Sequence, residues 1–170
     1  MKILDEQFLA NPGLWEHLVS IPDLKIVLLR RPKMLHSLRS KRQAETTGVW
    51  QVVMTVSEPQ PAPVVRLELD ECLRYFSAVT TFIADVRVAF SSRIHEVTYE
   101  DLCDRSADTL TGICRFLEVP PHSEFASVLR RQETRSPSDV IVGYDELIDQ
   151  LQRTQWGDPN TRPPGVEQPW

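Results

Sequence analysis

The pattern of hydrophobic and polar residues predicts two well-defined strands. Ile26 to Leu29 is a short, continuous apolar run of branched residues, which is typical of a strand buried on both faces of a parallel sheet. Arg93 to Tyr99 alternates polar and apolar residues, as a strand with one buried face does. Val49 to Val56 and Val64 to Leu67 contain β-branched residues and predict two shorter extended segments.

Helical spacing of apolar residues separates these strands. The longest helical pattern runs from Leu69 to Ser91, and Asp70 is its expected N-cap. Further helices are predicted over residues 5–21 with a break near Asn11, from Pro32 to Thr47, over 106–117, after Ser123 through Leu129, and over 144–152. Strands separated by helices imply right-handed crossovers, so the predicted fold class is α/β, a parallel sheet flanked by helices.

The composition is that of one ordinary globular domain, with 170 residues, 41% hydrophobic and 25% charged. We expect this domain to cover residues 1–157, and the proline-rich residues 158–170 to form a flexible tail. No segment reaches the roughly 18 consecutive apolar residues that span a bilayer, and the N-terminus lacks the apolar core of a signal peptide. The expected location is therefore the cytoplasm.

Cysteine and histidine give no indication of a metal site. Cys72, Cys103 and Cys114 are far apart and lack any paired spacing, so they predict buried free thiols in a reducing compartment. The four histidines are equally scattered. We therefore expect no bound metal.

Positive charge is concentrated in one segment. Between Lys25 and Ala44 there are seven basic residues and no acidic one, whereas the whole chain has a net charge of −5. One basic segment in an acidic chain argues against nucleic acid as a partner, because general nucleic-acid binding needs a broad basic surface.

Arg30 and Arg31 lie where the first strand ends and the basic helix begins. Ligands of open α/β sheets bind outside the carboxyl ends of the strands, and a helix N-terminus with two arginines predicts a phosphate or sulfate site. The alternative is that the long basic side chains cover one helix and keep their charged ends in water.

Five segments, in this order, carry a resemblance to a known family. They are Lys25–Lys33, Thr47–Trp50, Val97–Leu102, Phe116–Val119 and Gly143–Leu147. Over roughly residues 14–156 the chain resembles the C-terminal half of sulfotransferases that use 3′-phosphoadenosine-5′-phosphosulfate (PAPS), most of all the bacterial Stf0 and nodulation-type carbohydrate sulfotransferases. The resemblance implies a P-loop-like α/β fold and transfer of a sulfuryl group from PAPS to a hydroxyl on a carbohydrate or small molecule.

The resemblance also implies which residues bind the donor nucleotide. In the family, an arginine at the end of a strand and a serine on the following helix hold the 3′-phosphate. Arg31 with Ser40 is the preferred pair, nine residues apart, and Arg30 and Ser37, seven apart, are the alternates. Neither pair has the family's usual spacing, which lies between the two. Tyr99 matches a tyrosine that contacts the adenine.

One part of the family pattern has no counterpart in this sequence. Sulfotransferases open with a strand and a Ser/Thr/Gly-rich turn around the 5′-phosphosulfate, usually followed by the catalytic base, whereas the six glycines here form no cluster. We therefore expect a chain without the N-terminal strand and donor loop, a fragment or one half of a complementing pair. No catalytic residue is assigned, and unpaired sheet edges would favour self-association.

Two functional interpretations follow from these observations. The first is a sulfotransferase, or a portion of one, that binds PAPS or its product 3′-phosphoadenosine 5′-phosphate (PAP) and a sulfate acceptor. The second is a non-catalytic relative that binds a nucleotide or another protein. A P-loop kinase is disfavoured because the sequence contains no G-x-x-x-x-G-K-[ST] motif.

Overall fold

The computed structural model describes residues 11–50, 52–53, 61–121, 129–130 and 135–158. The chain divides into two compact units, which are described separately: unit 1 is Met1–Arg30 with Ser77–Ser123, and unit 2 is Arg31–Phe76 with Glu124–Trp170. Several sequence predictions lie outside the described residues: the helix over 5–10, most of the extended segment over 49–56, the helix over 123–128, and the tail from residue 159.

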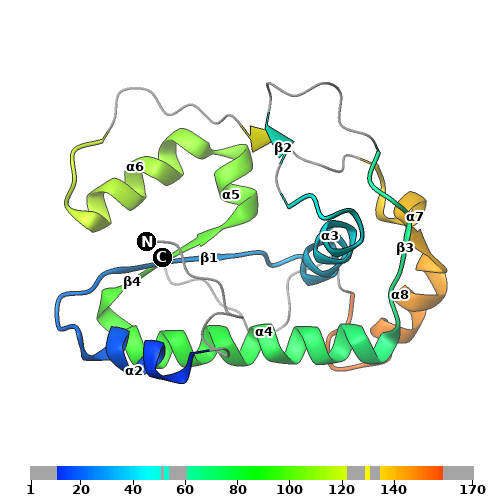
Figure 1. Cartoon of the computed structure of the whole chain (residues 1–170), viewed down its shortest axis with the longest axis horizontal. Helices are drawn as coiled ribbons and strands as arrows, with labels where there is room; N and C mark the ends of the chain where they lie inside the picture. Colours follow the sequence, from blue (N-terminus) through cyan, green and yellow to red (C-terminus); the bar gives the residue numbers. More distant parts are fainter. Residues whose placement is uncertain (1–10, 51, 54–60, 122–128, 131–134, 159–170) are drawn as a thin grey trace. The chain divides into compact units, whose positions relative to one another are not determined.

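Helices and strands alternate along the chain (Figure 1). The helices are α2 (Pro12–Ser20), α3 (Met34–Thr47), α4 (Leu69–Phe90), α5 (Tyr99–Asp104), α6 (Ser106–Leu117), α7 (Pro137–Val140) and α8 (Tyr144–Gln152), with a 3-10 turn at Ser91–Arg93. The strands are β1 (Ile26–Arg30), β2 (Val52–Val53), β3 (Val65–Arg66), β4 (Ile94–Thr98), β5 (Leu129–Arg130) and β6 (Ile141–Val142). The predicted α/β class is confirmed, as are the predicted helices that correspond to α4, α6 and α8.

Within the described residues, the strands form three two-stranded sheets, whereas the sequence predicted one parallel sheet. The pairs β1–β4 and β3–β6 are parallel, but β2–β5 is antiparallel. The prediction of a helix through Leu129 is wrong at that end, because Leu129 and Arg130 pair with β2. A short apolar run fits helix or strand equally well, and here pairing with a distant segment decides.

In unit 1 the strands β1 and β4 lie between two helical layers (Figure 1). On one face, Ile26 and Ile94 pack with residues of α2 and α4 around the buried Leu18, Val86 and Phe90. On the other face, His95 of β4 packs against Phe116 of α6. Side chains alternate between the faces of a strand, so every second residue of β4 points toward α4.

The contact between β4 and α6 is built on one aromatic pair. His95 stacks on Phe116 with the ring centroids 5.2 Å apart. A Cβ at Gly112 would lie 3.7 Å from the imidazole Nε2, which is ordinary van der Waals contact, so Gly112 faces His95. Lys25 donates a hydrogen bond of 2.9 Å to the carbonyl of Phe116, which ties the end of α6 to the segment that leads into β1.

Strand β1 is less buried than the sequence predicted. Four of its five residues are half-buried, and Leu29 is 52% exposed. The prediction of burial on both faces is therefore wrong at Leu29.

Two predicted helix starts are shifted. The N-cap of α3 is Lys33, so Pro32 precedes the helix instead of occupying its first turn. Because α4 begins at Leu69, Asp70 lies in the first turn and is not the N-cap. Its carboxylate there still interacts favourably with the positive end of the helix dipole.

Unit 2 has buried residues of its own. Its largest fully buried side chains are Phe76, Leu35, Leu151, Val140 and Cys72. Phe76 stands edge-on to Trp156 with the ring centroids 5.6 Å apart. Burial raises the pKa of the Cys72 thiol to about 12, which keeps that thiol protonated and unreactive. Cys103, in contrast, is exposed, so the prediction that all three thiols are buried is wrong.

Replacing Phe90 by alanine should lower the free energy of unfolding by about 3–5 kcal/mol, because the removed ring leaves a cavity in the core of unit 1. Phe90 is 2% exposed, and Trp15 packs edge-on against it with the ring centroids 5.8 Å apart. Denaturant unfolding followed by circular dichroism is the measurement. Val88→Ala is the matched control on the same helix: Val88 is 82% exposed, so its loss should change the free energy by less than about 0.5 kcal/mol. Equal losses of unfolding free energy in the two variants would contradict the placement of Phe90 in the core.

Candidate anion-binding site

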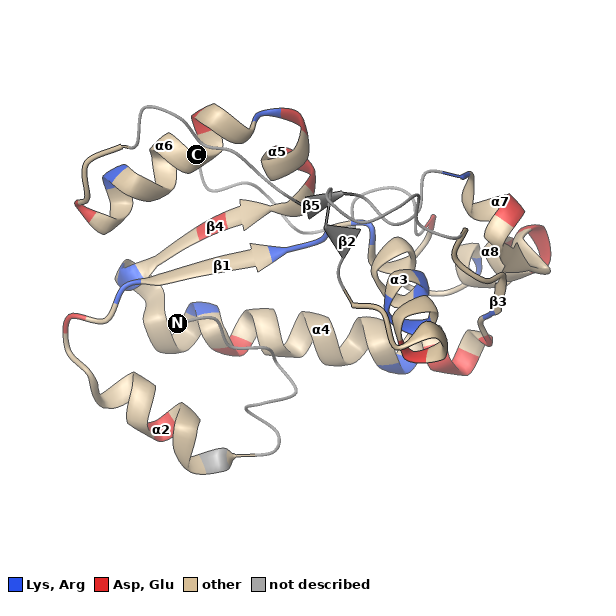
Figure 2. Ribbon diagram, turned by 45° about the horizontal axis from the view of Figure 1, so that its top comes forward, with Lys and Arg blue, Asp and Glu red and all other residues tan. Residues whose placement is uncertain are grey.

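The basic segment between Lys25 and Ala44 is only partly available to a ligand. Figure 2 shows Lys and Arg residues gathered on α3. Basic residues of the segment, however, form ion pairs with acidic residues outside it, among them Lys25 with Glu118, Arg30 with Glu96, and Arg42 with Glu71 and Glu45. Arg39 is buried, at 4% exposed. The segment therefore does not form one ligand-facing basic surface, and the individual residues must be considered separately.

The preferred arginine and serine meet in unit 2. Arg31 Nη1 donates a hydrogen bond of 3.3 Å to Ser40 Oγ, and both side chains are half-buried. Arg31 comes just before α3, and Ser40 lies in the second turn of that helix. The helix carries Ser40 back toward Arg31, so a separation of nine residues still brings the guanidinium and the hydroxyl together. Both groups donate hydrogen bonds, and a shared anion could accept from both.

The alternate serine, Ser37, contacts Tyr75, which was not among the predicted site residues. Ser37 Oγ and the Tyr75 hydroxyl are 2.8 Å apart, and both residues are half-buried. Tyr75 comes from α4, in the part of that helix that belongs to unit 2. Tyr75 lies three residues after the buried Cys72, so helical spacing puts it on the buried side of α4. This spacing was the sequence signal that could have identified Tyr75.

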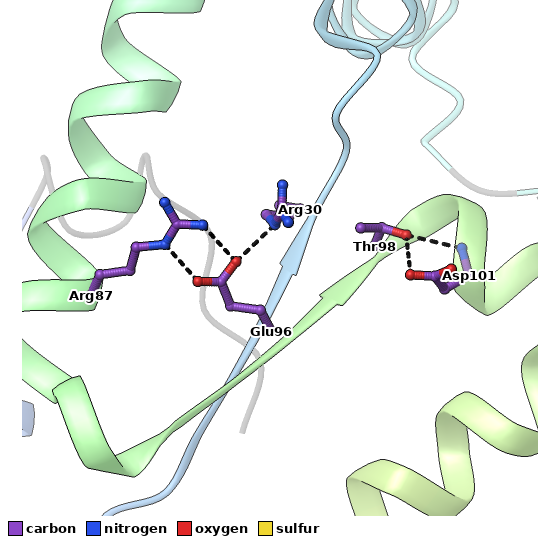
Figure 3. A network of polar contacts seen from close by, with 5 residues as sticks. All are labelled: Arg30, Arg87, Glu96, Thr98 and Asp101. Atoms are coloured by element: carbon purple, nitrogen blue, oxygen red, sulfur yellow. Dashed lines mark hydrogen bonds and ion pairs between the residues drawn. The ribbon is translucent and has the colours of Figure 1, made fainter. Parts of the chain in front are cut away.

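The alternate arginine, Arg30, is held by a carboxylate in unit 1 (Figure 3). Arg30 Nε lies 2.8 Å from Glu96 Oε2, and the two side chains are 10% and 12% exposed. Arg87 of α4 donates to both carboxylate oxygens of Glu96, at 2.5 and 2.8 Å. Part of the charge of Arg30 is thus compensated by Glu96 within unit 1.

Strand register brings Arg30 and Glu96 to the same face. Arg30 pairs with Thr98 in the parallel register, and Glu96 lies two residues before Thr98. Glu96 shares this face with Ile94, which packs against the core. A carboxylate on a strand face that packs against a helix needs a charged or hydrogen-bonding partner, and the spacing of Glu96 from Ile94 was the sequence signal for the ion pairs.

The two arginines shift the protonation of Glu96. Hydrogen bonds from Arg87, followed by the charges of Arg87 and Arg30, lower the pKa of the carboxyl below its ordinary value, although burial opposes the shift. The same contact raises the pKa of Arg87. Glu96 is therefore ionised at neutral pH, and the cluster of two guanidinium groups and one carboxylate carries a net positive charge.

Tyr99 lies at the carboxyl end of β4, as the sequence predicted. It is the first residue of α5 and is half-buried. Thr98 caps this helix: its Oγ1 accepts a hydrogen bond of 3.0 Å from the backbone N–H of Asp101 (Figure 3). Tyr99 belongs to unit 1, whereas Arg31 and Ser40 belong to unit 2. Its contact with an adenine ring stays a prediction.

Two further structural properties bear on function. In the described part of the chain, no helix is both long and apolar enough to cross a membrane. The described residues also contain no cluster of three or more His, Cys, Asp or Glu side chains that could hold a metal ion.

Comparison with known proteins identifies the family. The profile of the sulfotransferase family matches residues 14–124, well over half of the chain. The chain therefore belongs to the sulfotransferase family, and the resemblance inferred from the five segments is confirmed.

Two relatives share the name nodulation protein H. The one from Rhizobium tropici is 36% identical over 148 residues, which cover 86% of this chain and 58% of the relative. The one from Rhizobium meliloti strain 1021 is also 36% identical over 148 residues, covering 86% of this chain and 60% of the relative. The chain thus spans well under two thirds of the length of these relatives. No solved structure matches it.

Glu96→Gln should destabilise unit 1 by about 3 kcal/mol, because it leaves two arginines facing each other without their shared carboxylate. Denaturant unfolding at pH 7 is the measurement. Glu118→Gln is the control: Glu118 pairs with Lys25 at 2.9 Å, but its side chain is 81% exposed, so its loss should change stability little. Equal losses of unfolding free energy in the two variants would show that the ion pairs of Glu96 stabilise unit 1 no more than an exposed ion pair does.

The stabilisation by Glu96 should depend on pH. Folding lowers the pKa of this carboxyl, so its contribution is fully present above the pKa of the unfolded chain and is lost as the pH falls through the lower, folded pKa. The difference in unfolding free energy between the wild type and Glu96→Gln should therefore shrink from pH 7 to pH 3. Unfolding curves measured at several pH values test this, and a difference independent of pH would contradict it.

Proposed function

We propose that this chain supplies the 3′-phosphate-binding part of a sulfotransferase that uses PAPS as its sulfuryl donor. The observation that carries the proposal is the contact of Arg31 Nη1 with Ser40 Oγ at 3.3 Å, in a chain of the sulfotransferase family. Arginine is always protonated at physiological pH and its planar group matches the geometry of a phosphate. The serine hydroxyl adds a second donor from a different element.

The chemistry of these two side chains suits a phosphate monoester. Such a group carries about −1.5 to −2 charges at pH 7 and has three strong acceptor oxygens. Both side chains are half-buried, and solvent and salt screen charges less there than on an open surface. The site should therefore distinguish nucleotides that have a 3′-phosphate from those that have only a 5′-phosphate.

The reaction proposed for the whole protein is transfer of a sulfuryl group from PAPS to an acceptor hydroxyl, with PAP as the second product. The proposed acceptor is a carbohydrate or other small molecule, and the proposed fold of the catalytic domain is P-loop-like; both follow from the family resemblance. Tyr99 is proposed to contact the adenine. We assign no catalytic base within this chain.

Arg31→Ala should weaken PAP binding by about 10- to 150-fold, because a hydrogen bond to a charged group contributes roughly 1.5–3 kcal/mol. Calorimetric titration of the purified chain with PAP, and in parallel with adenosine 5′-phosphate, is the measurement. Arg66→Ala is the matched control, since Arg66 is an exposed arginine of the same unit. It removes the same charge and should leave PAP affinity within about twofold of the wild type.

A preference for PAP over adenosine 5′-phosphate that disappears with Arg31 would support the proposal. A folded wild-type chain that binds both nucleotides equally, or neither, would refute it. In that case the interpretation as a non-catalytic interaction partner becomes the better one.

A further inference from the structure

Ser37 of α3 makes a polar contact with Tyr75, close along the helix to the contact of Ser40 with Arg31. The hydroxyls of Ser37 and Tyr75 lie 2.8 Å apart, and either one can be the donor. Ser37 and Ser40 are three residues apart on α3, so they lie on the same face of the helix, with Cβ atoms about 5–6 Å from each other. The two contacts therefore sit side by side on one face of α3.

We propose that Ser37 and Tyr75 belong to the same phosphate site as Arg31 and Ser40, and that Tyr75 is a phosphate ligand contributed by α4. This inference rests on the proposed function and extends it. The family resemblance requires one arginine and one serine, whereas the structure brings a second serine and a tyrosine onto the same helical face. Ser37 and Ser40 then act together and are not alternatives.

The donor chemistry fits a single phosphate group. In the Ser37–Tyr75 pair, whichever hydroxyl accepts the hydrogen bond keeps its own O–H, and hydroxyl groups rotate to suit their partners. Arg31 contributes a guanidinium and Ser40 another hydroxyl. Three phosphate oxygens can accept all of these donors, and hydrogen bonds to an ionised acceptor are about twice as strong as neutral ones.

The electrostatics of this face also favour an anion. Ser37, Ser40, Arg31 and Tyr75 are all half-buried, so a bound phosphate would be partly withdrawn from solvent. The first turn of α3 contains no acidic residue. Glu71, one helical turn before Tyr75 on α4, is paired with Arg42, so its negative charge is partly compensated.

Tyr75→Phe tests the proposal because it removes only the phenol oxygen. The ring remains, and with it the edge-on contact with Phe76, whose ring centroid lies 6.3 Å away. We expect the ratio of PAP affinity to adenosine 5′-phosphate affinity, measured by calorimetry on the full chain, to fall about tenfold. A purely structural role would not change this ratio, because it would affect both nucleotides equally.

Tyr144→Phe is the matched control. Tyr144 is a half-buried tyrosine at the start of α8 in the same unit, far along the chain from the basic helix. It should leave the affinity ratio unchanged. Thermal unfolding without nucleotide verifies that each variant is folded; if Tyr75→Phe is not, Ser37→Ala takes its place, with the same expected fall in the ratio.

The outcomes separate this inference from the proposed function. If the wild type prefers PAP and Arg31→Ala abolishes the preference, but Tyr75→Phe lowers the ratio less than threefold or no more than Tyr144→Phe does, the inference is wrong and the proposed function stands. If the wild type shows no preference, both are wrong. A larger fall specific to Tyr75→Phe supports the inference.

A double-mutant cycle tests whether the two hydroxyls act as one unit. If Ser37 and Tyr75 orient each other toward the phosphate, the two substitutions should not be additive. The ratio of PAP affinity to adenosine 5′-phosphate affinity should then be only slightly lower in the double variant than in the more damaging single variant. Strictly additive losses would show that the hydroxyls do not act through their mutual hydrogen bond and would overturn that part of the proposal.

Discussion

The parallel pairing of β1 with β4 is the constraint on which the arrangement of unit 1 depends. The register sets Arg30 opposite Thr98, so the carboxyl ends of both strands lie side by side. Helix α5 begins directly after Thr98. It also sets the parity of each strand, because alternate side chains point to opposite faces. Ile26 and Ile94 therefore meet α2 and α4, whereas His95 meets α6. A shift of one residue would reverse every one of these contacts.

Two consecutive arginines have different surroundings. Arg30 ends β1 on the face of Glu96, whose half-buried carboxylate is shared with Arg87. Arg31 lies just after the end of β1, and its side chain contacts Ser40 of the helix that follows. Burying Arg30 without Glu96 would be costly, since an uncompensated buried charge is strongly unfavourable. The partner of Arg30 is thus a carboxylate of the neighbouring strand, whereas Arg31 contacts a serine hydroxyl of the following helix.

In unit 2, a single helical face of α3 presents the groups that can recognise an anion. Ser37 and Ser40 are one turn apart, and each contacts a residue from outside the helix, Tyr75 and Arg31 respectively. Another face of α3 contributes the buried Leu35 and Leu38. Packing of the apolar face therefore fixes the orientation in which the two serines are presented. This is the physical link between the core of unit 2 and its proposed chemistry.

Local elements and family membership could be predicted from the amino-acid sequence. The bounds of α6 and α8 and the strands near 26–30 and 94–98 followed from periodicity, because this signal is carried by neighbouring residues. The choice of Arg31 and Ser40 as a pair came from the family resemblance, and their role in binding a phosphate stays a prediction. Only the tertiary structure revealed the partners that lie far apart in the chain: Glu96 for Arg30, Tyr75 for Ser37, and β2 for the residues of β5. Strand register and helix packing decide such contacts. Neither can be deduced from a local pattern, since each depends on two segments at once.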